Sequence, residues 1–524
     1  MTAARPVEAD EDIAALARGG RTNFFGFLLR LAARLPFLFI AGRIYGPEML
    51  GRFAYAILIV EFAAQLATLG LKRGLAQQLS STDKPHVCVV ADALLVAFIA
   101  SGIATLVLAI FPQAMFPNSA IHGFEWLLPL IVFAIAGSDV SLAALAYRHN
   151  VKATVTARAI VEPWTISIAA FVLSYLSSRD GLIIAYVLSM VAALLASLWP
   201  LYKSYGLPRG WRPNPGVLWN LARRNTPLAG ADAIEWASRR IDIAILGLFF
   251  SPAIVGIYYV AQQVASLPQK LKTSFDPILG PVITEKLAEG DKAAVARQVR
   301  QVGFWIIAAQ TGIALALAIP GQAVMGLVGP GFIGGTGALA FLLFAEAIAA
   351  TAVVSEAALV YIARHRNLMI SVAMLSVQAG LSVALILLLR EVRPYFPAYM
   401  KDGVGNAIPD SESTFIAAGV AIALMAAVGL SSILKSRLLG RLLGTSVQAW
   451  RWALVWAALA AAIVGQAVVR IPEWGELILG IPLILLTFGV IVWRWGFTHE
   501  DRVLFRMKKP KEPTLPPPGF SSPR

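Results

Sequence analysis

Residues 87–111 read VCVVADALLVAFIASGIATLVLAIF, an apolar run that contains one charged residue, Asp92. A helix of about 20 apolar residues is long enough to span the hydrocarbon core of a bilayer. The chain contains fourteen candidate spans, at residues 22–44, 50–70, 87–111, 124–147, 159–177, 181–202, 227–250, 254–275, 302–326, 338–361, 367–389, 414–436, 449–469 and 474–495. The first, seventh and eighth are interrupted by charge. The sequence therefore predicts an all-α, polytopic membrane protein with about 14 transmembrane helices.

Composition and charge agree with this fold class. Of the 524 residues, 58% are hydrophobic and 14% are charged, and the mean hydropathy is +0.71. A soluble protein is roughly half apolar and a quarter charged. The net charge of +14 arises largely from short loops that follow every second span, whereas residues 112–123, 251–253 and 327–337 contain no Lys or Arg. The positive-inside rule places the basic loops and both termini in the cytoplasm, so we expect no nucleic-acid partner.

Other common signals are lacking. Cys88 is the only cysteine and the five histidines lie far apart, so we expect neither a disulfide framework nor a metal site. Residues 1–21 do not contain a short apolar core followed by a cleavage site, so we expect a cytoplasmic N-terminal segment rather than a signal peptide. The basic, proline-rich residues 496–524 predict a disordered cytoplasmic tail.

A weak internal repeat relates two parts of the chain. A shift of about 205 positions aligns Arg34 with Arg239, Gly42 with Gly247, Pro47 with Pro252, Gly51 with Gly256 and Ala56 with Ala261. Each copy reads as an arginine-bearing helix, a Pro-x-x-x-Gly turn and a second helix. An even number of spans separates the copies, which predicts a parallel repeat about an axis along the membrane normal.

Charged residues inside spans point to a polar cavity. Such a residue costs roughly 2.5–3.5 kcal/mol at mid-bilayer and normally faces the bundle interior or water. The guanidinium group is planar, stays protonated and donates paired hydrogen bonds, which suits a phosphate-bearing substrate. The candidate substrate ligands are Arg30, Arg34, Arg52, Arg239 and Arg240. Further cavity or ion-coupling candidates are Asn23, Glu61, Asp139, Glu162, Asp232, Glu235, Asp242 and Glu346.

Some of these charges have a structural alternative. Asp232, Glu235, Arg239 and Asp242 follow i, i+3, i+7, i+10 spacing, which predicts one stripe along the seventh span. Glu235 and Arg239 could instead neutralise each other as an i, i+4 pair. Asp139 and Glu162 could exchange protons or cations, or could face water at helix ends.

The opening 60 or so residues after the N-terminal segment resemble a known family. Gly46-Pro47-Glu48 is followed by Gly51 and Phe53, and then by Leu69-Gly70-Leu71 and Arg73-Gly74. This stretch resembles the start of Wzx-type polysaccharide flippases of the multidrug/oligosaccharidyl-lipid/polysaccharide (MOP) superfamily, which also holds the MATE exporters and the lipid II flippase. The layout of spans is similar over about residues 20–495.

The resemblance implies two pseudo-symmetric six-helix lobes, MATE-like, plus two C-terminal helices. The implied divisions are an N-lobe at 22–203, a cytoplasmic linker at 204–226, a C-lobe at 227–437 and the last two helices at 438–495. The implied function is transport rather than catalysis. The resemblance implies that undecaprenyl-diphosphate-linked oligosaccharide repeat units move from the cytoplasmic to the periplasmic leaflet of a bacterial inner membrane by alternating access. The implied pathway is exopolysaccharide, capsule or O-antigen biosynthesis. Arg30, Arg34 and Arg52 match the expected diphosphate ligands by helix and depth.

The expected partners are the lipid-linked oligosaccharide, the bilayer, and polymerase and export machinery, with a monomeric chain. No cofactor is expected, and coupling to H⁺ or Na⁺ stays open. A lipid II flippase and a MATE-like cation-coupled multidrug exporter are the alternatives. The exporter is disfavoured because Arg30 and Arg34, with no acid in their span, would repel organic cations. A membrane enzyme is disfavoured because the longest outside loop, 390–413, has no evident catalytic pair.

Overall fold

The computed structural model describes residues 35–82, 84–117, 121–148, 150–273, 283, 286–287, 289–392, 411–498 and 501. These residues are almost wholly helical, and none of them lies in a β-strand. The prediction of an all-α polytopic protein is confirmed.

The helices fall into three consecutive groups. The N-terminal half contains η1 (Ala41–Tyr45), α2 (Gly46–Ala67), α3 (Leu71–Ser80), α4 (His86–Ile110), η2 (Pro112–Ala114), η3 (Gly123–Leu130), α5 (Ile131–Tyr147), α6 (Val151–Val155), η4 (Thr156–Val161), α7 (Glu162–Ser174) and α8 (Gly181–Tyr205). The C-terminal half contains α9 (Pro215–Ser238), α10 (Ile241–Phe249), α11 (Pro252–Thr273), α13 (Lys292–Ala318), α14 (Gly321–Val328), η5 (Pro330–Gly335), α15 (Thr336–Ile362), α16 (Arg364–Val392) and α17 (Ser411–Leu443). The last group is α18 (Trp452–Val468), α19 (Glu473–Gly475), η7 (Glu476–Gly480), α20 (Ile481–Ile491) and η8 (Val492–Gly496).

Ten helical stretches among the described residues are long and apolar enough to cross a bilayer, and the shorter α18 is also apolar. The count of fourteen is not confirmed by the part of the chain that is described. The helices α9, α10 and α11 are not among the ten, because α10 has only nine residues and the other two carry charged and polar side chains. These helices correspond to the spans that the sequence marks as interrupted.

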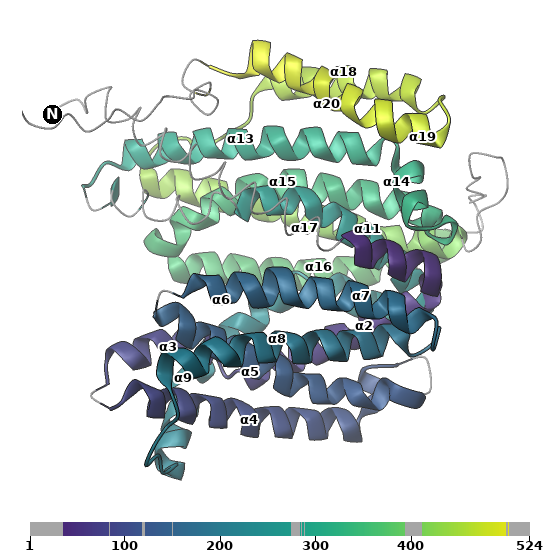
Figure 1. The fold of residues 1–524 in the computed structure, drawn as a ribbon. Helices are drawn as coiled ribbons and strands as arrows, with labels where there is room; N and C mark the ends of the chain where they lie inside the picture. Colours follow the sequence, from purple (N-terminus) through teal and green to yellow (C-terminus); the bar gives the residue numbers. More distant parts are fainter. Residues whose placement is uncertain are drawn as a thin grey trace, which may run out of the picture.

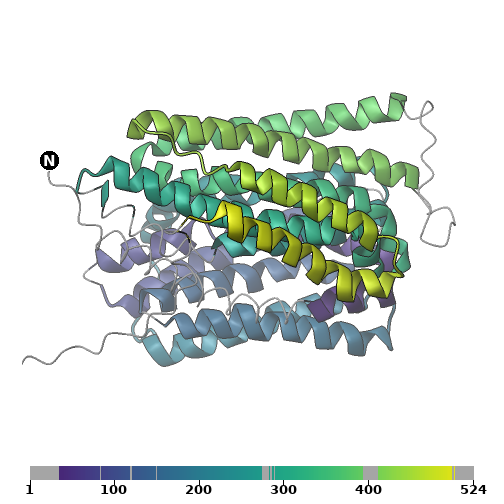
Figure 2. The same ribbon diagram turned by 90° about the horizontal axis from the view of Figure 1, so that it is seen from above.

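The long helices lie side by side as one bundle (Figures 1 and 2). Helices α4, α5 and α8 form one side of the view in Figure 1, and α13, α15 and α17 lie on the other side. Helices α18 and α20 form an extra layer that packs on α13. The end of the bundle that contains Lys72, Arg73 and Arg148 is called the basic end below, and the end that contains Pro47 and Pro252 is called the opposite end.

The seventh predicted span differs from the expectation. Helix α9 ends at Ser238, Arg239 and Arg240 form a turn, and α10 begins at Ile241. Arg240 leaves the helical conformation, with φ −137° and ψ 1°. The prediction of one continuous stripe from Asp232 to Asp242 is therefore wrong, because the turn separates Asp242 from the others. Helix α9 begins at Pro215, within the range 204–226 that the resemblance assigns to a linker.

The two copies of the Pro-x-x-x-Gly repeat pack against each other at the opposite end. A Cβ atom added to Gly51 of α2 would overlap the carbonyl oxygen of Pro252 and lie 2.7 Å from the nitrogen of Gly256. In the reciprocal position, a Cβ atom on Gly256 of α11 would overlap the carbonyl oxygen of Pro47 and lie 2.9 Å from the nitrogen of Gly51. The backbones of the two halves therefore meet through small residues, and the contact is nearly the same in both directions. The repeat read in the sequence is thus a structural contact between the halves.

Candidate functional site

Part of the predicted site lies outside the described residues. This applies to Asn23, Arg30 and Arg34, and to the side chain of Glu235. Arg239 is exposed at the C-terminal end of α9, and Glu346 is half-buried on α15. The remaining predicted residues, apart from Asp242, fall into four polar clusters rather than one.

The first cluster holds Arg52 in a structural ion pair. Its Nη2 donates to both carboxylate oxygens of Glu125, at 2.7 and 2.9 Å, and its Nε donates to one of them at 3.2 Å. Glu125 is itself buried and accepts a hydrogen bond from the backbone N–H of His122, which caps η3. The guanidinium group also lies 4.9 Å from the ring centre of Phe116. Arg52 is therefore engaged within the N-terminal half.

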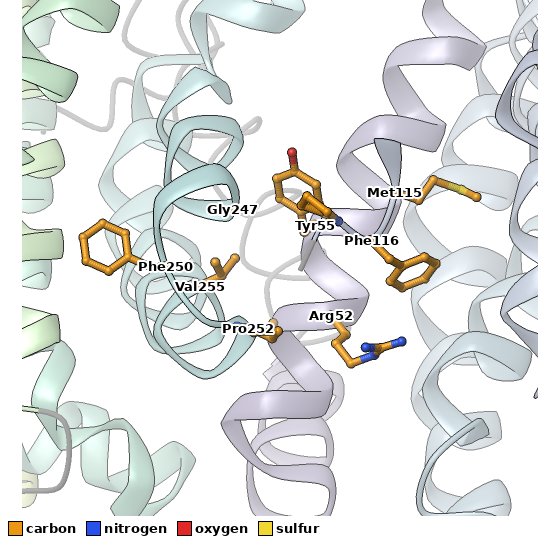
Figure 3. Close-up of a pocket in the computed structure, with 10 residues that line it drawn as sticks. Arg52, Tyr55, Met115, Phe116, Gly247, Phe250, Pro252 and Val255 are labelled. Carbon is orange, nitrogen blue, oxygen red and sulfur yellow. The ribbon is translucent and has the colours of Figure 1, made fainter. Parts of the chain in front are cut away.

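A small cavity adjoins this cluster at the crossing of the two halves. It has a volume of about 20 Å³ and is lined by residues that include Gly51, Tyr55, Gly247 and Pro252. Figure 3 shows the Arg52 side chain pointing away from α11. A volume of this size holds about one water molecule. The cavity is therefore far too small for a sugar, and it does not separate the halves at this end.

The second cluster joins Asp139 and Glu162 through Arg158. The Nη2 of Arg158 donates to Asp139, and its Nη1 donates to Glu162 at 2.9 Å. Arg158 lies in the π-helical turn η4, and such turns are common at functional sites. Lys72 approaches Asp139 at 3.7 Å. Arg158 precedes the predicted fifth span, 159–177, and was not among the predicted site residues, although its i, i+4 spacing from Glu162 could have revealed the pair.

The third cluster links the two halves at the basic end. Arg73 of α3 forms an ion pair with Asp232 of α9, with an Nε–Oδ1 distance of 2.7 Å. Close to it, a Cβ atom on Gly70 would lie 2.6 Å from the carbonyl oxygen of Asn225 and 2.7 Å from the nitrogen of Ala229. Gly70 also has a φ of +70°, which favours glycine. The α3–α9 contact thus depends on close backbone approach as well as on charge.

The fourth cluster lies between the Gly51–Gly256 crossing and the Arg73–Asp232 pair, and it also joins the two halves. Arg240, at the break between α9 and α10, approaches Glu61 of α2 with an Nη1–Oε2 distance of 3.3 Å. Tyr186 of α8 donates a hydrogen bond to the other carboxylate oxygen of Glu61 at 3.2 Å. Glu61 lies ten residues beyond Gly51, which is about 15 Å along α2. The Arg240–Glu61 pair is therefore well inside the bundle.

Aromatic side chains support this interior pair. The guanidinium group of Arg240 lies 5.6 Å from the ring centre of Trp236, and the Trp236 ring lies 5.3 Å from that of Phe62 on α2. The Tyr186 ring packs edge-on against Phe53 at 5.7 Å. Tyr186 was not predicted, because a tyrosine in an apolar span gives no signal of its own in the sequence.

Asp242 lies next to the fourth cluster, within electrostatic reach of Arg240. It is 1% exposed and accepts hydrogen bonds from the Ile243 backbone N–H at 2.9 Å, the Tyr258 hydroxyl at 3.1 Å and the Gln262 amide at 2.8 Å. These donors join α10 to α11. Asp242, the second residue of α10, therefore ties the start of this helix to α11.

The C-terminal half has a further ion pair, with a buried lysine, that the predicted site did not include. Lys435 of α17 donates to Glu356 of α15 and to Ser371 of α16, each at 3.0 Å. The Lys435 side chain is 5% exposed, so this contact ties three helices together. Within the described residues, no group of three or more His, Cys, Asp or Glu side chains could hold a metal ion.

Comparison with known proteins relates part of the chain to a family. Residues 26–285, just under half of the chain, match the model of the family described as polysaccharide biosynthesis protein. The match ends near the close of the eighth predicted span, so it includes all residues of the Arg240–Glu61 cluster. No curated protein matches the chain.

Two solved structures share its fold. One is the inward-facing conformation of a multidrug resistance MATE family transporter of the MOP superfamily, with 16% identity and a TM-score of 0.58 over 80% of this chain and 99% of that one. The other is the lipid II flippase MurJ in an inward closed conformation, with 13% identity and a TM-score of 0.57 over 92% of this chain and 98% of that one. The chain is therefore a multi-pass membrane protein with the MOP transporter fold. Both neighbours are transport proteins rather than enzymes.

Proposed function

We propose that this protein is a flippase that moves an undecaprenyl-diphosphate-linked oligosaccharide from the cytoplasmic to the periplasmic leaflet of a bacterial inner membrane. The polysaccharide family and the MOP fold support this transport class. The alternation of basic and uncharged loops supports a cytoplasmic position for the basic end and for both termini. The closed crossing of Gly51 and Gly256 would then lie on the periplasmic side, and the substrate would enter from the other side.

Arg240 is the observation that carries the substrate assignment. It lies at a break in a helix between the two halves, which is where transporters of this general design bind charged groups. Its side chain is 34% exposed, compared with 10% for Arg52, and its pair with Glu61 is a single contact of 3.3 Å. Arg240 therefore keeps hydrogen-bonding capacity for the oxygen atoms of a diphosphate. Arg239 is its neighbour at the same break.

The test is the effect of Arg240→Ala on polymer export. We expect lipid-linked repeat units to accumulate on the cytoplasmic leaflet and surface polymer to fall, while the protein level in the membrane stays the same. Arg209→Ala is a matched control, because Arg209 is an exposed arginine in the 206–214 connection. Normal export by a stably inserted Arg240→Ala variant would refute the assignment.

A lipid II flippase is the second candidate, favoured by the shared fold over 92% of this chain. The substrate in that case is also a lipid diphosphate, so Arg240 would have the same role. A complementation assay separates the two candidate functions: this protein is expressed in cells depleted of their own lipid II flippase. We expect it not to restore growth, and restored growth would favour the lipid II flippase.

A further inference from the structure

We propose that Glu61 is an internal counter-ion that the diphosphate of the substrate displaces from Arg240. This inference rests on the proposed function, and it assigns Glu61 as a positioning residue rather than a substrate ligand. It follows from the geometry of the pair, from the support that Glu61 has on its own half, and from the cost of a lone charge in a membrane.

The Arg240–Glu61 pair is more easily opened than the pairs made by Arg52 and Arg158. Arg52 holds Glu125 through three hydrogen bonds, and Arg158 holds two carboxylates at once. Arg240 has one contact with Glu61, and the two side chains are 34% and 25% exposed. A ligand that enters between the halves can reach this pair, and it needs to break only one contact.

Glu61 keeps a partner when Arg240 leaves it. Its two carboxylate oxygens are divided between the halves, since Oε2 faces Arg240 and Oε1 accepts the hydrogen bond from Tyr186. Tyr186 is 5% exposed and is held by its packing on Phe53. Displacement therefore costs Glu61 its ionic contact but not its hydrogen bond within the N-terminal half.

The pair has a clear use in a transport cycle. An arginine without a counter-charge is costly inside a membrane. The substrate neutralises Arg240 during transfer, and Glu61 neutralises it again once the substrate has left. The empty protein can then return without a lone charge between its halves. The same contact ties α2 to the α9–α10 break, so displacement by the substrate also loosens the halves.

This arrangement predicts opposite effects on binding and on turnover. In Glu61→Gln the substrate no longer competes with a carboxylate, so its affinity rises. The return of the empty protein becomes slower, because Arg240 loses its nearest counter-ion. In Glu61→Gln, the half-saturating substrate concentration and the maximal rate should therefore both fall. Loss of a substrate ligand would instead raise the half-saturating concentration.

The binding experiment uses the purified full-length protein in detergent and farnesyl diphosphate as the probe. We expect Glu61→Gln to bind the probe about threefold to tenfold more tightly than the wild type, as for loss of one partly exposed ion pair. Tyr186→Phe, which keeps the ion pair, should give a smaller change. Glu48→Gln is the control, because Glu48 is an exposed carboxylate in the first turn of the same helix.

The outcomes separate this inference from the proposed function. If the wild type binds farnesyl diphosphate and Glu61→Gln binds it equally or more weakly, Glu61 is not a displaced counter-ion, and the proposed function stands. If neither protein binds the probe and Arg240→Ala exports normally, both proposals fail. Tighter binding that is also seen in Glu48→Gln would show a general effect of charge on affinity and would overturn the specific role of Glu61.

A reversed pair tests the tie between the halves without any ligand. Glu61→Arg combined with Arg240→Glu keeps opposite charges across the interface but moves the cation to α2. We expect the distance between spin labels on the two halves to match the wild type in this double variant and to broaden in Glu61→Gln. An unchanged distance distribution in Glu61→Gln would show that the Arg240–Glu61 pair does not hold the two halves together.

Discussion

At the scale of single residues, Arg52 and Arg240 show that the same side chain in the same bundle can have two roles. Arg52 donates three hydrogen bonds to the buried carboxylate of Glu125 within one half of the chain. Arg240 makes one longer contact between the halves. Removal of one partner from a buried pair leaves an uncompensated charge, whereas an open pair loses little. The two arginines should therefore differ when they are substituted.

We predict that Arg52→Gln is mainly a stability defect. The free energy of unfolding should fall by about 3 kcal/mol, because Glu125 is left buried and unpaired. The double variant Arg52→Gln with Glu125→Gln should recover much of this loss and should also recover export. Thermal unfolding in detergent measures the first effect, and surface polymer measures the second. A double variant that is stable but still unable to export would show that Arg52 binds substrate.

At the scale of helices, the crossing of α2 and α11 depends on the absence of side chains. Both glycines of the repeat face the backbone of the other half, and an added methyl group has no free space at either one. We predict that Gly51→Ala wedges the two halves apart at the opposite end. The halves would then favour the conformation that is open at this end.

Labelling of a buried cysteine measures this opening. In a chain with Cys88→Ala and Val255→Cys, the thiol beside the crossing should react slowly with a membrane-impermeant reagent from the periplasmic side, and several times faster once Gly51→Ala is added. Gly230→Ala is the control, because no atom lies within 4 Å of a Cβ atom at that position. Equal labelling in all three chains would contradict the wedge.

At the scale of the whole molecule, Asp501 attaches the chain beyond η8 to the rest of the bundle. It pairs with Arg451 at 2.5 Å and accepts a hydrogen bond from the Trp305 indole of α13 at 3.1 Å. The guanidinium group of Arg451 also lies 3.8 Å from the ring centre of Phe304. Burial opposes ionisation of Asp501, but hydrogen bonds from Arg451 and Thr498 outweigh it and lower the pKa of this carboxyl.

The lowered pKa fixes the sign of a pH dependence. A carboxyl group with a lower pKa in the folded state stabilises the fold above its unfolded pKa of about 4, and the contribution is lost as the pH falls below that value. We predict that Asp501→Asn lowers the melting temperature at pH 7 and that its difference from the wild type narrows as the pH falls from about 5 towards 3. Glu289→Gln, at a half-exposed ion pair, is the control and should show little difference at either pH. If the melting temperatures of Asp501→Asn and the wild type differ by the same amount at every pH, Asp501 does not stabilise the fold through its charge.

The sequence by itself determined the fold class, because apolar runs such as 87–111 have no stable place outside a bilayer. It also indicated the repeat, whose Pro-x-x-x-Gly segments lie at the starts of α2 and α11 rather than in turns and prove to be in contact. It identified Arg240 and Glu61 as interior charges, but it could not pair them, since they are far apart in the chain. Only the tertiary structure decided the distant partners: it paired Arg52 with Glu125, Arg158 with Asp139, and Arg240 with Glu61. The physical reason is that hydropathy is a property of each segment, whereas the energy of a buried charge depends on what lies a few ångströms away.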